Sequence, residues 1–509
     1  MKISVVPAVG YCPAKETVTE SFDILYKVFG STMGGNMKQV LAIDMGATSI
    51  RGILGYIENG QFQMQEVMRM SHQIIRRDGK MKWQWQEIMN QIADTIDAYG
   101  NKIVSVGIDT WGVDFGLLDV DGNLIDSPLS YRDPKHIDGH RLALEKMSEE
   151  EIFLQTGNQV MAINTLFQLL SYRHHYPENW KKVKTVLMMP DLIQYMLTGQ
   201  KVGEETIWST SQILNLQTAE YSSEILEKMN FSSNLFPSIT KAGEISGNTQ
   251  NSVLEKLRKY SIDVISVCGH DTASAVLLTE AFYQKDCLFL SCGTWSLIGS
   301  LVDNAVITRE AYQRTLTNEL GYESKAMFFK NITGLYLFEK YKSQLETEWG
   351  RKINFSEIND FMAKAKPTDL VIDMEREAFG REDVLVKIAI DDYLIETGQT
   401  LPENEMKYFQ IIYNSLAEKY LQTMRAIETL AGRSFQKIHM IGGGAKSEYL
   451  CQLIADKLSL PVVAGPFEAT AMGNILIQLK AVGEIGSVEE GLALVKQNEK
   501  MKYYQPKES

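Results

Sequence analysis

Residues 39–57 read QVLAIDMGATSIRGILGYI, and the fold is predicted from this stretch and from its echo later in the chain. An apolar run ends in Asp44, a turn follows at Gly46, and a second apolar run returns, which predicts two antiparallel strands. Asn59-Gly60 is typical of a hairpin turn and predicts a third strand over 61–70. The backbone N–H groups of a glycine turn can surround a phosphate, with Asp44 above them for a metal-bound water. The alternative is a plain hairpin that Asp44 only initiates.

A similar pattern lies at residues 287–300, CLFLSCGTWSLIGS. An apolar strand again precedes a glycine turn and a second apolar run, and Ser291 stands where Asp44 stood. Two similar hairpins that open two successive domains predict an internal duplication, with the halves facing one another across a cleft.

The length of 509 residues is too great for one hydrophobic core and suggests two domains. We place the first domain at 37–278 and the second at 279–485, followed by a C-terminal tail over 486–509. The predicted boundary lies between the apolar end of the first half and the second hairpin.

Residues 1–36 fit neither domain, and we expect a non-native or disordered leader. The apolar piece 3–9 is too short for the core of a signal peptide. Gly34 and Gly35 precede Met37 at a distance at which their codons would spell a bacterial ribosome-binding site. Translation is therefore expected to begin at Met37.

Charge and composition exclude several classes of partner. The formal net charge is −13, without a basic stripe, which disfavours nucleic acid as a partner. No apolar run is long enough to span a bilayer, and His174-His175 has no carboxylate or cysteine at metal-ligand spacing, so an exposed helix is expected there. The cysteines lack CxxC pairing, and we expect reduced thiols and a cytoplasmic location. They are Cys12, Cys268, Cys287, Cys292 and Cys451.

An acidic side chain stands inside CGHDTASAV, residues 268–276. Residues 264–267 predict a buried strand, so Asp271 would lie at a strand-to-helix junction, with Thr272 or Ser274 capping the helix. A carboxylate held there is suited to accept a proton from a substrate hydroxyl. The alternative is that Asp271 serves only as the N-cap.

Aromatic residues follow another predicted strand, which succeeds a helix expected over 85–99. Trp111 and Phe115 flank Asp114 at the carboxyl end of that strand, where ligands gather in α/β sheets. They could line a sugar pocket with Asp109 or Asp114 as hydroxyl acceptors, or both could be core. We favour the pocket for Trp111, because Gly112 beside it leaves the backbone accessible.

The last part of the chain predicts a long amphipathic helix over 405–430, a strand over 437–441 and helices over 447–458 and 469–482. The glycines at 442–444 would let a flat ligand or its phosphates approach backbone amides and a helix N-terminus. Their spacing is neither that of a Walker loop nor that of a dinucleotide fingerprint.

Taken in order, four motifs resemble those of the FGGY carbohydrate kinases of the actin-like superfamily: DMGATS (44–49), GHDTAS (269–274), SCGTWS (291–296) and IGGGAKS (441–447). Three further stretches narrow the resemblance to members that act on L-rhamnulose: GIDTWGVDF (107–115), NITGLYL (331–337) and GPFEATAMGN (465–474). The resemblance runs from about residue 38 to about residue 483. It implies an α/β fold with two ribonuclease H-like (actin-like) domains flanking a catalytic cleft, the first binding sugar and phosphate and the second the nucleotide.

The resemblance also implies roles for single residues. It makes Asp271 the general base, and Asp44 would reach a magnesium ion through water. The residues expected to hold the sugar are Trp111, Gly112, His270, Asp271, Thr272 and Asn331. Those expected at ATP are Ala47, Thr48, Ser49, Ile50, Arg51, Thr294, Glu339 and Gly443. Ile50 and Glu339 depart from the family's usual glycine and glutamine.

The implied reaction is ATP-dependent phosphorylation of L-rhamnulose at O1, giving L-rhamnulose 1-phosphate and ADP in L-rhamnose catabolism. ATP and Mg²⁺ are the implied cofactors, the sugar and ATP are the partners, and we expect a monomer or homodimer without nucleic acid or membrane. The alternatives are a kinase for another ketose, such as L-fuculose or D-xylulose, and an actin-like ATPase switch. A sugar-sensing regulator is disfavoured because no basic helix-turn-helix segment is present.

Overall fold

A computed structural model describes residues 37–507 except residues 47 and 382. The predicted leader, 1–36, lies outside the described residues, and so does Ala47. Within the described part of the chain, no helix combines the length and the apolar character that crossing a membrane requires.

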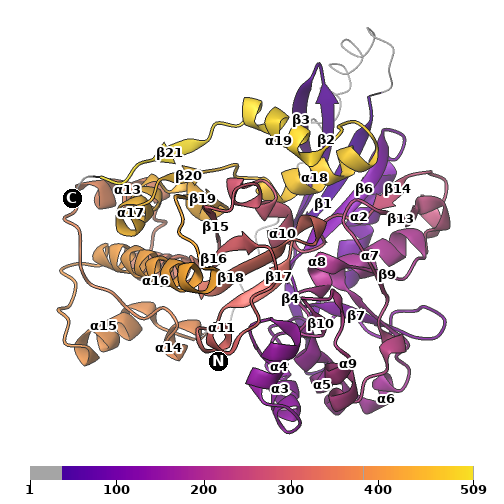
Figure 1. Cartoon of the computed structure of the whole chain (residues 1–509), viewed down its shortest axis with the longest axis horizontal. Helices are drawn as coiled ribbons and strands as arrows, with labels where there is room; N and C mark the ends of the chain where they lie inside the picture. The colour runs from indigo at the N-terminus through magenta and orange to yellow at the C-terminus, as the bar shows by residue number, and fades with distance from the viewer. Residues whose placement is uncertain (1–36, 47, 382, 508–509) are drawn as a thin grey trace, which may run out of the picture. The chain divides into compact units, whose positions relative to one another are not determined.

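The first half of the chain is built on a six-stranded sheet with the order β13-β14-β6-β1-β2-β3 (Figure 1). Its strands are β1 (Gln39–Met45), β2 (Ser49–Glu58), β3 (Gln61–Ser71), β6 (Ile103–Thr110), β13 (Ile245–Asn248) and β14 (Asp263–Ile265). The hairpin predicted at Asn59-Gly60 joins β2 and β3, and both residues have the positive φ angles, 51° and 73°, that such a turn requires. We call this sheet and the elements around it the first lobe.

The second half is built on a seven-stranded sheet with the order β17-β18-β16-β15-β19-β20-β21, which we call the second lobe with its surrounding elements. Its strands are β15 (Cys287–Cys292), β16 (Trp295–Val302), β17 (Thr317–Leu320), β18 (Ala326–Thr333), β19 (Lys437–Ile441), β20 (Val462–Ala464) and β21 (Lys502–Tyr504). The last strand, β21, lies in the segment described above as a tail and pairs with β20.

The two sheets repeat one topology. β1 pairs antiparallel with β2 and parallel with β6, as β15 pairs antiparallel with β16 and parallel with β19. The outer strands also correspond, because β3 and β18 extend the hairpins while β14 and β20 extend the parallel side. The duplication predicted from the hairpins is therefore confirmed, and so is the α/β fold class.

The helices of the first lobe pack around its sheet, and most of them lie in the segment between β6 and β14, which we call the helical excursion. They are α2 (Trp85–Tyr99), α3 (His136–Leu144), α4 (Glu149–Thr156), α5 (Thr165–His175), α6 (Pro177–Trp180), α7 (Met189–Thr198), α8 (Glu205–Trp208), α9 (Ser223–Met229) and α10 (Asp271–Val276). Small two-stranded sheets lie among them, formed by β4 (Ile74–Arg77) with β5 (Lys80–Trp83), β7 (Phe115–Leu118) with β8 (Thr185–Met188), β9 (Val202–Glu204) with β12 (Ser238–Thr240), and β10 (Leu214–Asn215) with β11 (Glu220–Tyr221). The bounds of α2 are those predicted from its 3.6-residue apolar period, and Ile88, Ile92 and Ile96 are fully buried.

The remaining helices follow the second hairpin. They are α11 (Arg309–Gln313), α12 (Tyr336–Trp349), α13 (Phe355–Lys364), α14 (Glu377–Gly380), α15 (Val386–Glu396), α16 (Lys407–Ala431), α17 (Glu448–Leu458), α18 (Ala469–Ala481) and α19 (Val488–Asn498). The long helix α16 confirms the amphipathic pattern, since its apolar face is buried in the core of the second lobe.

Helix α18 joins the lobes, because it comes late in the chain yet packs on the first sheet (Figure 1). The Asn474 side-chain amide donates to the carbonyl oxygen of Gly107 at 3.2 Å and to Oδ2 of Asp109 at 2.6 Å. The Gln478 amide donates to the carbonyl oxygen of Leu41 at 3.0 Å. These buried bonds attach the second half of the chain to the strands β1 and β6.

Replacing Gly473 by alanine is expected to lower the free energy of unfolding by about 1–3 kcal/mol. A Cβ at this position would lie 2.1 Å from the carbonyl oxygen of Ser274 on α10, so α18 and α10 would have to separate. Urea denaturation measures the loss. Gly380→Ala is the matched control, because its Cβ meets nothing within 4 Å, and it should change stability by less than about 0.5 kcal/mol. Equal stability of the two variants would contradict the tight approach of the helices.

Candidate active site

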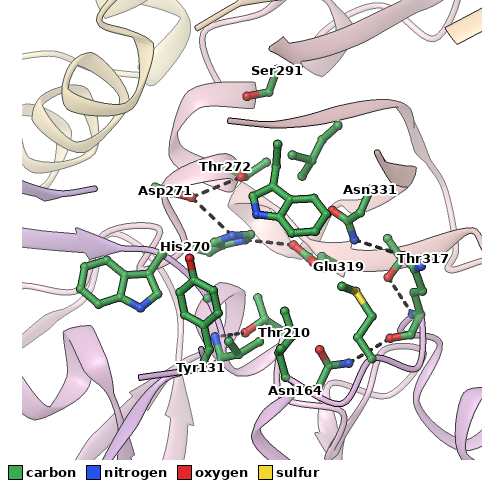
Figure 2. Close-up of a pocket in the computed structure, with 18 of the residues that line it drawn as sticks. Tyr131, Asn164, Thr210, His270, Asp271, Thr272, Ser291, Thr317, Glu319 and Asn331 are labelled. Carbon is green, nitrogen blue, oxygen red and sulfur yellow. Dashed lines mark hydrogen bonds and ion pairs between the residues drawn. The ribbon is translucent and has the colours of Figure 1, made fainter. Parts of the chain in front are cut away.

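A cavity of about 350 Å³ has walls from both lobes (Figure 2). All the residues predicted to hold the sugar line it: Trp111, Gly112, His270, Asp271, Thr272 and Asn331. Thr294 and Gly442, from the glycine turns of the second lobe, line it too. The volume is within the range of small-ligand sites and suits a monosaccharide.

Asp271 is the first residue of α10 and does not cap it. His270 occupies the N-cap position with extended backbone, and no side chain caps this helix through a hydrogen bond. The prediction that Thr272 or Ser274 would cap the helix is wrong, because the Thr272 hydroxyl donates to Oδ1 of Asp271 at 3.2 Å and the Ser274 hydroxyl donates to the carbonyl oxygen of Thr470 on α18. The Asp271 side chain keeps 31% of its surface exposed, so its carboxylate is available at the cavity.

The electrostatic surroundings of Asp271 favour proton uptake. Burial raises the pKa of its carboxyl group, the nearby charge of Asp44 raises it further, and the positive charge of His270 lowers it. A carboxylate with a raised pKa is a stronger base than one in water.

A buried carboxylate behind the cavity holds the turn that carries Asp271. Oε2 of Glu204 accepts the backbone N–H of Gly269 at 2.9 Å and the hydroxyl of Thr206 at 2.6 Å. The hydroxyl oxygen of Thr206 in turn accepts the backbone N–H of His270 at 3.2 Å. Burial raises the pKa of Glu204 to about 7. Sequence reasoning missed this residue, which lies far from the GHD motif along the chain.

Trp111 belongs to a polar aromatic cluster at the edge of the cavity. Its indole N–H and that of Trp83 both donate to Oδ2 of Asp114, at 2.9 and 2.6 Å, and His72 stacks on the Trp111 ring. The Gln168 amide donates to the other oxygen of Asp114. Trp111 therefore lines the cavity, while most of its surface is buried.

The cavity is not lined by Asp109, Asp114 or Phe115, which the sequence suggested for a sugar pocket. Asp114 is fully buried and holds the two indoles, and burial raises its pKa to about 6. Asp109 is also fully buried and accepts the Asn474 amide. Phe115 packs into the core around the helical excursion. The prediction that Asp109 or Asp114 meets the sugar is thus corrected, because neighbouring elements enclose both carboxylates.

The first hairpin presents an arginine between two carboxylates. Arg51 on β2 donates to Asp44 on β1 and to Glu468, which directly precedes α18. Burial raises the pKa of Asp44, while the charge of Arg51 opposes this rise. Thr48 is exposed in the turn and Ser49 is half-buried, so both are accessible to a ligand. The ion pairs place Arg51 where the lobes meet.

The other residues predicted at ATP differ in accessibility. The side chain of Ile50 is fully buried, so only its backbone could meet a ligand. Gly443 is exposed directly after the cavity-lining Gly442. Glu339 lies in the first turn of α12, where burial raises its pKa.

The two glycine turns of the second lobe approach each other closely. Gly442 has a φ of 83°, and a Cβ there would lie 2.8 Å from the carbonyl oxygen of Cys292. Only glycine allows this approach without strain. Trp295, the first residue of β16 after the neighbouring turn, lines the cavity with 43% of its surface exposed.

The acidic groups near the first hairpin have the donor chemistry that Mg²⁺ prefers. Asp44 and Asp109 are paired neighbours on β1 and β6, and Oδ1 of Asp109 is buried without a hydrogen-bond partner among the described residues. Mg²⁺ is usually held by one or two carboxylates, waters and substrate phosphates. Over the same part of the chain, no group of three or more metal-ligating side chains occurs.

The prediction of an exposed helix at the histidine pair is wrong for most of α5, which is buried over residues 165–172. The cysteines agree with their prediction as reduced thiols. His174 is exposed, while His175 ends α5 and lies 2.9 Å from Oδ2 of Asp138, a carboxylate that the local sequence did not reveal. The four cysteines of the described residues are free and buried: Cys268, Cys287, Cys292 and Cys451.

Several cavity residues were not predicted from the sequence. They are Tyr131, Asn158, Gln159, Asn164, Thr210, Thr317 and Glu319. Most come from the helical excursion, and Thr317 and Glu319 come from β17 of the second lobe. The only sequence signal for any of them is the acidic residue Glu319 within the short strand β17, TNEL.

Comparison with known proteins agrees with this geometry. Residues 39–277 match the N-terminal domain of the FGGY family of carbohydrate kinases, and residues 288–482 match its C-terminal domain. The rhamnulokinase of Bacteroides thetaiotaomicron is 36% identical over 476 residues, covering 93% of this chain and 97% of the relative. That of Oceanobacillus iheyensis is 34% identical over 462 residues, covering 90% and 96%.

Solved structures share the fold at low sequence identity. A ligand-bound xylulose kinase from Lactobacillus acidophilus has a TM-score of 0.75 at 16% identity, with 92% of this chain and 94% of that chain covered. Plasmodium falciparum glycerol kinase with ADP also has a TM-score of 0.75, at 14% identity and coverage of 94% and 95%. Together with the family match over both halves, these findings lead to one assignment. The chain belongs to the FGGY family of carbohydrate kinases.

Proposed function

We propose that this protein transfers the γ-phosphoryl group of ATP to O1 of L-rhamnulose, giving L-rhamnulose 1-phosphate and ADP. The observation that carries the proposal is the position of Asp271, whose accessible carboxylate lies in a monosaccharide-sized cavity with walls from both lobes. The similarity to rhamnulokinases over more than nine-tenths of the chain supports L-rhamnulose as the sugar.

On the sugar side, Asp271 acts as the general base. Its carboxylate accepts the proton of the C1 hydroxyl as that oxygen attacks the γ-phosphorus in line with the leaving ADP oxygen. His270, Thr272 and Asn331 offer hydrogen bonds to the other hydroxyls, and Trp111 with Gly112 shapes the wall. Holding the hydroxyl next to its base and phosphorus supplies much of the acceleration.

On the phosphate side, the two hairpin turns bring backbone N–H groups, and Arg51 brings positive charge. Thr48 and Ser49 would contact the phosphates from the first lobe and Thr294 from the second. Arg51 would exchange Glu468 for a phosphate oxygen and so offset the charge of the transferring group. Gly443 and Glu339 would lie toward the rest of the nucleotide.

Magnesium fits this site through Asp44, which would hold the ion through water. When bound, the ion would neutralise part of the phosphate charge. A cytoplasmic location, a monomeric or homodimeric state and the domain boundaries stay predictions from the sequence.

The test is ADP release, measured in a coupled assay with L-rhamnulose, L-fuculose, D-xylulose, L-ribulose and glycerol. We expect strong stimulation by L-rhamnulose and weak stimulation by the others, because a polar pocket rejects sugars that leave its hydrogen-bonding groups unpaired. A different preferred ketose would keep the chemistry and change the substrate. ATP hydrolysis that no sugar stimulates would reject the proposed kinase activity and favour an ATPase switch.

A further inference from the structure

A chain of three ionisable side chains, buried at Glu319 and His270, connects the second lobe to the proposed base (Figure 2). Oε2 of Glu319 on β17 lies 2.9 Å from Nδ1 of His270, and Nε2 of His270 lies 3.4 Å from Oδ1 of Asp271. The His270 and Glu319 side chains are only 9% and 10% exposed. The largely buried imidazole therefore stands between two carboxylates.

The charges of this chain favour an imidazolium. Carboxylates close to both ring nitrogens favour the doubly protonated imidazolium over the neutral ring. Burial lowers the pKa of His270, but Glu319 and then Asp271 raise it more strongly, to about 9. His270 is consequently a cation near neutral pH, and its charge favours the ionised form of Asp271.

Glu319 is held rigidly because the residues on both sides of it are bonded to the first lobe. The backbone N–H of Asn318 donates to the carbonyl oxygen of Gly157 at 3.0 Å. The backbone N–H of Leu320 donates to the hydroxyl of Ser209 at 2.9 Å. Strand β17 thus belongs to the second sheet yet is attached to the helical excursion of the first lobe.

Within the described part of the chain, the only ion pair of Glu319 is with His270. A buried carboxylate is energetically costly unless it is paired. Because His270, the partner of Glu319, also contacts the proposed base Asp271, this pairing indicates a role of Glu319 in the reaction.

We propose that Glu319 is a positioning residue for the phosphoryl transfer: through His270 it keeps the Asp271 carboxylate oriented and ionised toward the sugar hydroxyl. The inference rests on the proposed function, since it assigns Glu319 to the same reaction. It also makes the base depend on both lobes, because Asp271 and His270 come from the first and Glu319 from the second.

The first test is the variant Glu319→Gln, which keeps the shape and removes the charge. We expect kcat to fall about tenfold or more, as part of the roughly 10²–10⁴-fold that a general base supplies. The KM values for L-rhamnulose and ATP should change less than about threefold, because the substitution weakens stabilisation of the transition state and not the binding of the substrates. Glu323→Gln, at an exposed side chain four residues further on, is the matched control and should leave kcat unchanged.

The pH profile separates positioning from packing. The charged groups that act on His270 are Glu319, Asp271 and Glu204, and those that act on Asp271 besides His270 are Asp44 and Asp109. Without Glu319 the pKa of His270 falls, Asp271 loses its cation more readily, and the pKa of Asp271 rises. Because the base works when ionised, the acid limb of the kcat profile should move to higher pH in Glu319→Gln, whereas a packing defect would lower the profile without moving it.

Two further variants complete the test. Glu319→Asp keeps the charge and should recover part of the activity lost in Glu319→Gln, and it serves as the second variant if glutamine prevents folding. Combining Glu319→Gln with His270→Gln should cost little more than His270→Gln alone, because the two residues act as a unit.

Several outcomes would overturn the inference while wild-type protein still phosphorylates L-rhamnulose. They are an unchanged kcat in Glu319→Gln, a raised sugar KM at constant kcat as expected for direct sugar contact, an aspartate variant no better than glutamine, and additive effects with His270→Gln. Wild-type protein that no sugar stimulates would instead reject the proposed function, and the inference with it.

Discussion

Replacing Asp271 by asparagine is expected to lower kcat about 10²-fold or more, because the amide cannot accept the proton of the attacking hydroxyl. The side chain keeps its size, and no helix cap is lost, since Asp271 is the first helical residue and caps nothing. The expected KM values for ATP and sugar are close to those of the wild type. The coupled ADP assay with L-rhamnulose measures the effect.

The matched control is Asp121→Asn, which changes an exposed acid in a turn of the same lobe. It should behave as the wild type in turnover and in thermal unfolding. Near-normal turnover in a correctly folded Asp271→Asn protein would remove Asp271 from the mechanism.

The raised pKa of Asp271 gives this prediction a pH dependence. Its cause is burial, reinforced by the charge of Asp44 and opposed by that of His270. Activity requires the ionised carboxylate, so kcat is present above this pKa and is lost as the pH falls through it. The acid limb of the wild-type profile should therefore lie above the range of a solvent-exposed aspartate, about pH 4.

Replacing Arg51 by glutamine is expected to lower kcat about 10²-fold, a typical effect of removing one charged donor from a transferring group. The arginine is half-buried between Asp44 and Glu468, so the variant also leaves two carboxylates without their cation. Part of the stability should be lost as well, because breaking a buried ion pair leaves an uncompensated charge. Single-turnover kinetics at saturating ATP and a denaturant titration distinguish the two effects.

Arg69→Gln is the control for charge removal, because Arg69 is the cross-strand neighbour of Arg51 on β3 and pairs with Glu66 at the surface. Its loss should change kcat little. If Arg51→Gln lost only stability and kept full turnover after correction for the folded fraction, Arg51 would have a structural role only.

The local elements were predictable because they depend on neighbours in the chain. Turn chemistry at Asn59-Gly60, the apolar period of α2 and α16 and the glycine turns after two strands all act over a few residues. The repeated hairpin predicted the duplicated topology, and the GHD motif placed Asp271 at a strand-to-helix junction. These features required no knowledge of which segments meet in space.

The tertiary structure alone decided how distant segments complete the site. Asp114 was expected near the sugar, but it holds Trp83 and Trp111, because the strand β5 brings a second indole to it. Arg51 meets Glu468 across 417 residues of chain. Glu319 reaches His270 because β17 is bonded to the helical excursion.

The sequence by itself thus determined the two-lobed α/β fold, the family and the position of the proposed base. Only the tertiary structure decided which buried charges face one another, because such contacts join residues that no local pattern relates. Their energetics depend on burial and on partners at angstrom distances, and both arise only when the two sheets and their excursions are packed together.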